Sequence, residues 1–104
     1  MSTIAATVNW NDGVPSVTPD PIEVPTAEKN VTIVWSCGRN VQSFQIMGLT
    51  VSEFTLDSSP SGPTGTVQIT DANDSDTEYS YTVVATSISG ETAQHDPKIK
   101  NGAG

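Results

Sequence analysis

Cysteine and histidine are almost absent from this chain. Its 104 residues contain one cysteine, Cys37, and one histidine, His95. A single cysteine has no partner for an intramolecular disulfide, so the fold has to be stabilised by its apolar core. The sequence contains no recognisable constellation of catalytic or cofactor-binding residues. We therefore expect no cofactor and no enzymatic activity.

Positive charge is also scarce. Four Lys and Arg residues stand against twelve Asp and Glu, which gives a formal net charge of −8. Phosphate backbones and anionic lipid repel such a chain, which argues against nucleic acid and membrane surfaces as partners. No segment is long and apolar enough to span a membrane, and the first ten residues lack the pattern of a secretory signal. The compartment is unknown from the sequence, with the cytoplasm as the default expectation.

Helical periodicity is missing as well, because no window keeps apolar residues at three- and four-residue spacing. Short runs alternate instead between apolar and polar residues, most clearly over Ile4–Trp10, Val31–Trp35 and Tyr79–Ala85. A period of two places one set of side chains on one face of a strand. The pattern predicts an all-β fold, an antiparallel two-sheet sandwich of about seven to nine strands, formed by one domain over 1–104. We expect its core to contain Val31, Ile33, Trp35, Tyr79, Tyr81 and Val83.

Turn residues divide the chain between these runs. Asn11-Asp12-Gly13 predicts a tight turn. The prolines that follow restrict 21–24 to an edge strand or extended coil, because proline cannot donate to a central strand. Gly48 is expected to separate two strands. The segment 57–65 is predicted to be a flexible loop and the tail 101–104 to fray, because neither contains enough apolar material to pack.

The stretch Asp74–Thr86, with Tyr79 and Tyr81, resembles the penultimate strand and preceding corner of fibronectin type III and related immunoglobulin-like domains, and Trp35 fits the same picture. In that family a corner tyrosine folds its ring over the core and returns its hydroxyl to upstream backbone. Tyr79 is the matching position, and Tyr81 follows on the same face. The resemblance implies an immunoglobulin-like sandwich, although the chain lacks the paired inter-sheet cysteines and has an unusual proline-rich entry.

A second resemblance, to the cupredoxin sandwich, is carried by Pro21–Val24 followed by Val31–Trp35. A blue-copper site needs two imidazoles and a thiolate, and His95 is the only histidine. The sequence therefore excludes a copper carrier but leaves this fold open as an alternative.

The acidic run over 71–78 is the one cluster of hard oxygen ligands that suggests a metal. Its candidate calcium ligands are Asp71, Asn73, Asp74, Asp76 and Glu78. The run begins like a calcium-binding loop but lacks the glycine at the sixth position and the glutamate at the twelfth. The alternative interpretation is a solvated crossing between strands, in which short polar side chains cap their own backbone.

Cys37 is the candidate nucleophile, since the neighbouring Arg39 could lower the pKa of its thiol. A Cys–His pair would also require His95 to lie within reach, whereas the pattern favours a surface position for His95 in the last strand. The six aromatic residues could in principle form a sugar-binding platform. Core packing accounts for most of them, with Trp10 as the expected exception.

These observations predict a non-catalytic immunoglobulin-like module that presents loops or an edge strand to another protein. The second hypothesis is a calcium- or carbohydrate-binding sandwich that uses the acidic run or exposed aromatics. An enzyme dependent on Cys37 is the third. The choice of recognition rests on analogy with the uses of this scaffold.

Overall fold

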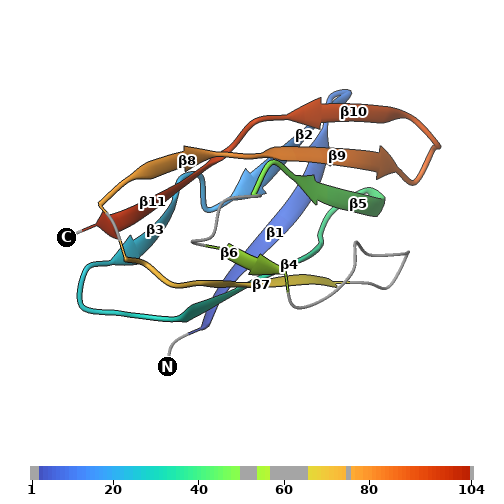
Figure 1. The fold of residues 1–104 in the computed structure, drawn as a ribbon. Helices are drawn as coiled ribbons and strands as arrows, with labels where there is room; N and C mark the ends of the chain where they lie inside the picture. Colours follow the sequence, from blue (N-terminus) through green and yellow to red (C-terminus); the bar gives the residue numbers. More distant parts are fainter. Residues whose placement is uncertain (1–2, 50–53, 57–65, 75, 104) are drawn as a thin grey trace.

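The computed structural model describes residues 3–49, 54–56, 66–74 and 76–103, which contain eleven β-strands and no helix (Figure 1). No helical segment that could cross a membrane therefore occurs in these ranges. The strands are β1 (Thr3–Asn11), β2 (Val14–Thr18), β3 (Ile22–Pro25), β4 (Val31–Cys37), β5 (Val41–Met47), β6 (Phe54–Leu56), β7 (Thr66–Asp71), β8 (Glu78–Ser80), β9 (Thr82–Ser87), β10 (Thr92–His95) and β11 (Lys98–Ala103). The expected all-β class is confirmed.

The largest sheet has five strands in the order β2-β1-β4-β7-β6. Strands β1 and β2 form an antiparallel hairpin around Asp12 and Gly13, whose φ angles of 51° and 84° fit the predicted tight turn. The chain continues through β2 and β3 before it reverses into β4, so β1 and β4 run in the same direction and pair in parallel. The remaining neighbours in this sheet are antiparallel.

The other strands form two three-stranded sheets, β10-β9-β5 and β3-β11-β8. Only Tyr81 separates β8 from β9, and only Asp96 and Pro97 separate β10 from β11. The Tyr81 amide donates to the Pro97 carbonyl at 3.0 Å, which connects the two interruptions. Strands β8 and β9 therefore form one extended segment, and β10 and β11 form another. The two segments lie side by side, and each small sheet contains one half of both.

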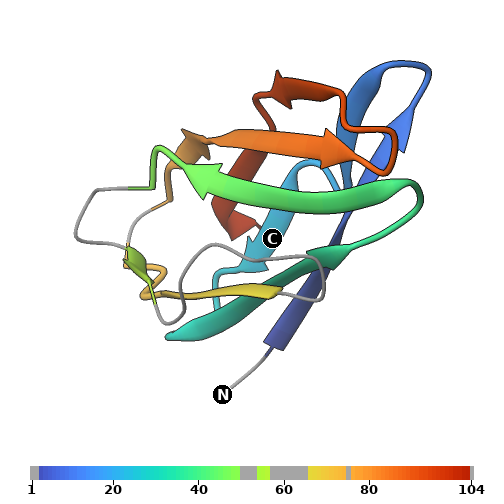
Figure 2. The ribbon, with the colours of Figure 1, turned by 90° about the vertical axis from the view of Figure 1, so that its right-hand side faces the viewer.

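The core lies between the five-stranded sheet and the two smaller sheets (Figure 2). Trp35 on β4 is 0% exposed, and its indole Nε1 donates to the Tyr81 hydroxyl at 3.1 Å. The two rings meet edge to face with centroids 5.5 Å apart. Val31, Ile33 and Val83 are also fully buried, as the alternation predicts.

Two details of the predicted architecture are wrong, and one strand was not predicted. Two of the three sheets are mixed rather than antiparallel, because β1–β4 and β3–β11 are parallel pairs. The described residues contain eleven strands in three sheets rather than seven to nine strands in two, because the interruptions at Tyr81 and Asp96–Pro97 split two long segments. The segment Val14–Thr18 was also not predicted as a strand, although Pro15 is accommodated there because β2 is an edge strand.

The aromatic prediction for Trp10 is wrong, and the one for Tyr79 is confirmed in part, since Tyr79 packs against the core without being fully buried. Tyr81 is 2% exposed and bonds Trp35, whereas Tyr79 is only half-buried and packs edge to face on Phe54 at 5.0 Å. Trp10, expected to be the exposed exception, is 6% exposed and belongs to the core. Its even-numbered position in β1 places its ring inward together with Ala6 and Val8.

The C-terminal tail does not fray over residues 101–103. These residues complete β11, and Asn101 is 2% exposed opposite Val24 of β3. Hydrogen bonds from Asn101 to Asp71 and from Gly102 to Asn73 hold this segment in place. The low apolar content of the tail therefore led to the wrong prediction that it would fray. Gly48, with φ 90°, follows the end of β5 as expected, whereas Gly104 and the predicted loop 57–65 lie outside the described residues.

Candidate functional site

A groove opens where the chain leaves the five-stranded sheet after β2. Strand β2 pairs with β1 only over Thr7–Asn11, and the chain then crosses through Pro19–Pro21 to β3, which pairs with β11 in the other layer. No described strand lies beside the β1 edge over Thr3–Ala6. The groove lies between this part of β1 and β3.

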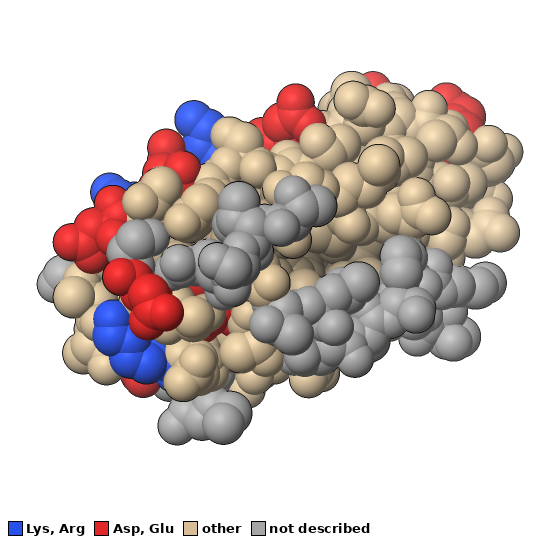
Figure 3. Space-filling model, viewed as in Figure 1, with Lys and Arg blue, Asp and Glu red and all other residues tan. Residues whose placement is uncertain are grey.

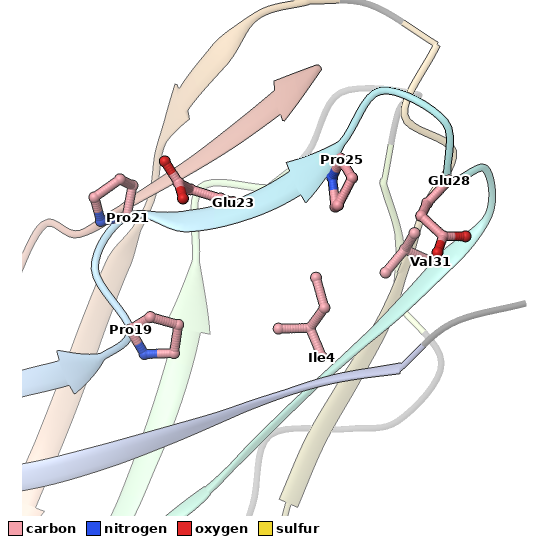
Figure 4. A pocket seen from close by; sticks show the side chains of 7 residues that line it. All are labelled: Ile4, Pro19, Pro21, Glu23, Pro25, Glu28 and Val31. Carbon is pink, nitrogen blue, oxygen red and sulfur yellow. The ribbon is translucent and has the colours of Figure 1, made fainter. Parts of the chain in front are cut away.

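The lining of the groove is apolar with an acidic rim (Figure 4). Its volume is about 370 Å³, near the lower end of the range of sites that bind small molecules or side chains. In the close-up view, the Ile4 side chain rises from β1 toward β3. The lining residues are Ile4, Pro19, Pro21, Glu23, Pro25, Glu28 and Val31.

Asn73 holds one end of the groove in place. Its Nδ2 donates to the carbonyl oxygens of Pro25 at 2.8 Å and Glu28 at 2.5 Å, and its Oδ1 accepts from the Gly102 amide at 3.1 Å. These bonds connect two lining residues, Pro25 at the end of β3 and Glu28 in the turn that follows, to the end of β11. With 2% exposure and a φ of 56°, Asn73 is a buried residue in the left-handed region, where asparagine is tolerated better than most residues.

A wider polar network supports Asn73. Asp71, 0% exposed, accepts from the Asn73 amide at 2.9 Å and from Asn101 Nδ2 at 3.0 Å, both through Oδ1. Lys29 Nζ donates to the Asn73 carbonyl at 2.6 Å. Gly102, with φ 72°, has no room for a Cβ because Asp76 lies against it. Buried polar groups that are bonded in this way fix one arrangement of the backbone around them.

Asp20 holds the opposite end of the groove. It lies between the two lining prolines Pro19 and Pro21, and its Oδ1 accepts from the Lys98 amide at 3.2 Å. Its Oδ2 lies 3.2 Å from His95 Nε2, an ion pair when the imidazole is protonated. The carboxylate thus ties the β2–β3 connection to the junction of β10 and β11.

Both charged residues that line the groove are acidic, and Lys100 lies opposite Glu23 in the pairing of β11 with β3. Glu23 and Glu28 line the groove, and neither takes part in an ion pair with any described cationic side chain. On the face shown in Figure 3, most of the visible carboxylates lie with basic side chains at the end that carries β3, β8 and β11, and a few others lie along the margin at β10. The groove therefore favours an apolar ligand that also carries positive charge.

The five candidate calcium ligands lie in two different environments. Asp71 and Asn73 are buried in the network described above. Asp74, Asp76 and Glu78 are exposed, and the Glu78 Oε1 lies 3.7 Å from the Lys98 Nζ. Among the described residues, no three His, Cys, Asp or Glu side chains are grouped as a metal site would require. The expected solvated crossing is wrong for Asp71 and Asn73, although Asp71 does cap nearby backbone at the Asn73 amide as expected.

The thiol does not have the environment predicted for a nucleophile. Burial raises the pKa of Cys37, the opposite of the effect expected from Arg39. The Cys37 Sγ lies 3.9 Å from the carbonyl oxygen of Gln42. The His95 imidazole, the base that a Cys–His pair would need, is hydrogen-bonded to the Asp20 carboxylate instead. His95, with 38% of its side chain exposed, has the predicted surface position in β10, one of the two halves of the last extended segment.

Comparison with models of known protein families and with curated proteins finds no match to this chain. The groove was not predicted from the sequence either. The one signal that pointed to it was the run of prolines at 15, 19, 21 and 25, which correctly indicated edge positions but not the gap between them.

Proposed function

We propose that the chain is a recognition module that binds another protein through the proline-lined groove. The observation that carries this proposal is the groove itself, an apolar depression of about 370 Å³ with two carboxylates outside any ion pair with described residues. Its two ends are fixed by Asn73 and Asp20, so the site is formed before a ligand arrives. Preformed sites of this kind bind at a lower entropic cost.

We further propose an immunoglobulin-like sandwich as the scaffold. The continuity of β8 with β9 and of β10 with β11 supports two layers around one core. The buried Trp35 and its contact with Tyr81 add support, since such domains have a tryptophan at the centre of the core. The inserted strand β1, between β2 and β4, is a departure from the simplest form of that fold.

The other hypotheses receive less support from specific observations. The raised pKa of Cys37 disfavours a thiolate nucleophile. The burial of Trp10, Trp35 and Phe44 removes these rings from any exposed sugar-binding platform. The Gly102 amide donates to the amide oxygen of Asn73, the atom that a calcium site would use as a ligand.

A selection from a library of displayed peptides tests the proposed function. Enriched peptides are titrated against the natural chain, against Glu28→Lys in the groove, and against Glu91→Lys in the turn between β9 and β10. Both variants change the net charge equally, and the turn between β9 and β10 lies at the other end of the molecule from β3 (Figure 1). We expect Glu28→Lys to weaken binding about tenfold, equivalent to about 1.4 kcal/mol, and Glu91→Lys to leave it within twofold.

The proposed function would be contradicted by a selection that enriches no peptide. It would also be contradicted by enriched peptides that bind Glu28→Lys and Glu91→Lys with equal affinity. Thermal melts of both variants confirm that each is folded before binding is compared.

A further inference from the structure

The groove has a second property that points to the kind of segment it binds. One of its walls is the edge of β1 over Thr3–Ala6, which β4 covers on one side and no described strand covers on the other. Uncovered strand edges offer unpaired backbone groups to extended peptides. Which groups are offered here follows from the pairing of the rest of β1.

The β1–β2 hairpin fixes the direction of each amide. Asn11 and Val14 flank a two-residue turn, so they form a hydrogen-bonded pair. Such pairs alternate in an antiparallel ladder, which makes Asn9–Ser16 and Thr7–Thr18 hydrogen-bonded pairs as well. The odd-numbered residues of β1 therefore direct their N–H and C=O groups toward β2.

The even-numbered residues point the other way. The Gly38 amide donates to the Val8 carbonyl at 2.7 Å, and the Trp10 amide donates to the Arg39 carbonyl at 2.9 Å, both on the β4 side of β1. Continuing this alternation along the strand, Thr3 and Ala5 direct their N–H and C=O groups toward the uncovered edge. An added strand can bond these two residues through alternate residues of its own backbone.

We infer that the ligand of the groove is an extended segment of a partner protein, which adds as a strand to β1 at Thr3–Ala6 with an apolar side chain facing Ile4 and basic side chains facing Glu23 and Glu28. This inference rests on the proposed function and specifies its binding mode. The residue of the segment opposite Ile4 points to the same face as Ile4, which is the face that lines the groove. Residues two positions away share that face and can meet the acidic rim.

Charge favours such a partner over a second copy of this chain. Two copies joined at β1 would each bring a net charge of −8 and two groove carboxylates to the contact. A segment with Lys or Arg on its inward face instead neutralises Glu23 and Glu28. Basic residues beside an apolar residue are thus the chemistry that the groove recognises.

A designed peptide tests the binding mode. The probe is a fluorescein-labelled heptapeptide, Ser-Lys-Thr-Val-Thr-Lys-Ser, in which valine and both lysines share one face of a strand. Binding is measured by fluorescence anisotropy with the natural chain and with Ala5→Pro and Ala5→Ser. The proline removes the outward N–H of Ala5 without breaking a bond to β4, whereas serine is of similar size and keeps that N–H.

We expect the natural chain and Ala5→Ser to bind the probe equally, and Ala5→Pro to bind it at least about fivefold more weakly, the equivalent of about one hydrogen bond. N-methylation of the probe should produce a similar loss on the unaltered protein, at the two threonine amides if the probe adds antiparallel to β1 and at the valine and second lysine amides if it adds parallel. This test does not depend on the folding of a variant. Replacement of both lysines by glutamate should weaken binding by at least about tenfold.

Equal binding to Ala5→Pro and Ala5→Ser, or no effect of N-methylation, would overturn strand addition. So would failure of the natural chain to bind the probe at millimolar concentration. In each case the proposed function survives if displayed peptides still discriminate Glu28→Lys from Glu91→Lys. Self-association of the natural chain that Ala5→Pro abolishes would assign the edge to a second copy instead and overturn the inference.

Discussion

The indole nitrogen of Trp35 donates a hydrogen bond to the hydroxyl of Tyr81 across the core, with 3.1 Å between the two atoms. Trp35 lies on β4 of the five-stranded sheet, and Tyr81 lies at the junction of β8 and β9. Both side chains are almost completely buried. The bond therefore joins the two layers at the point where the strands of the second layer are interrupted.

Loss of this bond should destabilise the fold measurably. Tyr81→Phe keeps the ring but leaves the buried indole N–H without its acceptor, which costs about 1–3 kcal/mol in the free energy of unfolding. Urea denaturation followed by tryptophan fluorescence measures the change. The matched double variant Trp35→Phe/Tyr81→Phe gives the coupling energy, which should be at least about 0.5 kcal/mol. A coupling energy of zero would contradict the structural role of the bond.

Alkaline pH should weaken the fold through the same tyrosine. Burial raises the pKa of Tyr81 well above its ordinary value, which outweighs the opposite effect of the Trp35 hydrogen bond, and the negative charge of Asp20 raises it further. A tyrosine in the unfolded chain ionises near pH 10, so above that pH the unfolded state loses a proton that the folded state keeps. This contribution to stability is fully present below about pH 10 and decreases at higher pH.

Urea denaturation at a series of pH values between about 9 and 11.5 measures this dependence. The free energy of unfolding should fall more steeply above about pH 10 in the natural chain than in Tyr81→Phe. Parallel curves for the two proteins would show that Tyr81 ionises as readily in the folded state as in the unfolded state.

Substitution of Asn73, which holds one end of the groove, should destabilise the fold strongly. Asn73→Ala removes three side-chain hydrogen bonds and keeps a φ of 56° that alanine adopts poorly. We expect a loss of about 3 kcal/mol in the free energy of unfolding. Asn11→Ala, at an exposed position in β1, is the control and should change stability by no more than about 0.5 kcal/mol. A loss below about 1 kcal/mol for Asn73→Ala would show that this network does not hold the groove.

Cys37 should react slowly with thiol reagents. Its partial burial raises the pKa of the thiol, so less thiolate is present at neutral pH than in an exposed cysteine. Labelling with a chromogenic disulfide at pH 7 should be slower than that of a free cysteine peptide and should accelerate when urea unfolds the chain. Labelling faster than that of the peptide would revive the hypothesis of a reactive nucleophile.

The alternation of apolar residues was sufficient to predict the all-β class and most of the core, because inward residues of a strand occur at every second position. It placed Trp35 and Val83 correctly. It could not distinguish parallel from antiparallel neighbours, since both have the same period. The insertion of β1 between β2 and β4 depends on how the chain reverses, which the pattern of a single strand does not record.

The polar part of the site was less accessible to prediction. Asp71, Asn73 and Asn101 occur in stretches whose composition is typical of solvated loops, yet all three are buried because they bond one another and the nearby backbone. By contrast, Ile22 and Ile99 are fully buried, as apolar residues usually are, and lie directly opposite each other in the parallel pair β3–β11.

Amide hydrogen exchange at Ala5, with and without the heptapeptide, tests the central claim most directly. In the free chain we expect Ile4 and Ala6 to be protected through β4 and Ala5 to exchange rapidly at the uncovered edge. Saturation with the peptide should protect Ala5 and leave Ile4 and Ala6 unchanged. An Ala5 amide that is already protected in the free chain, or that exchanges equally fast with bound peptide, would contradict the account.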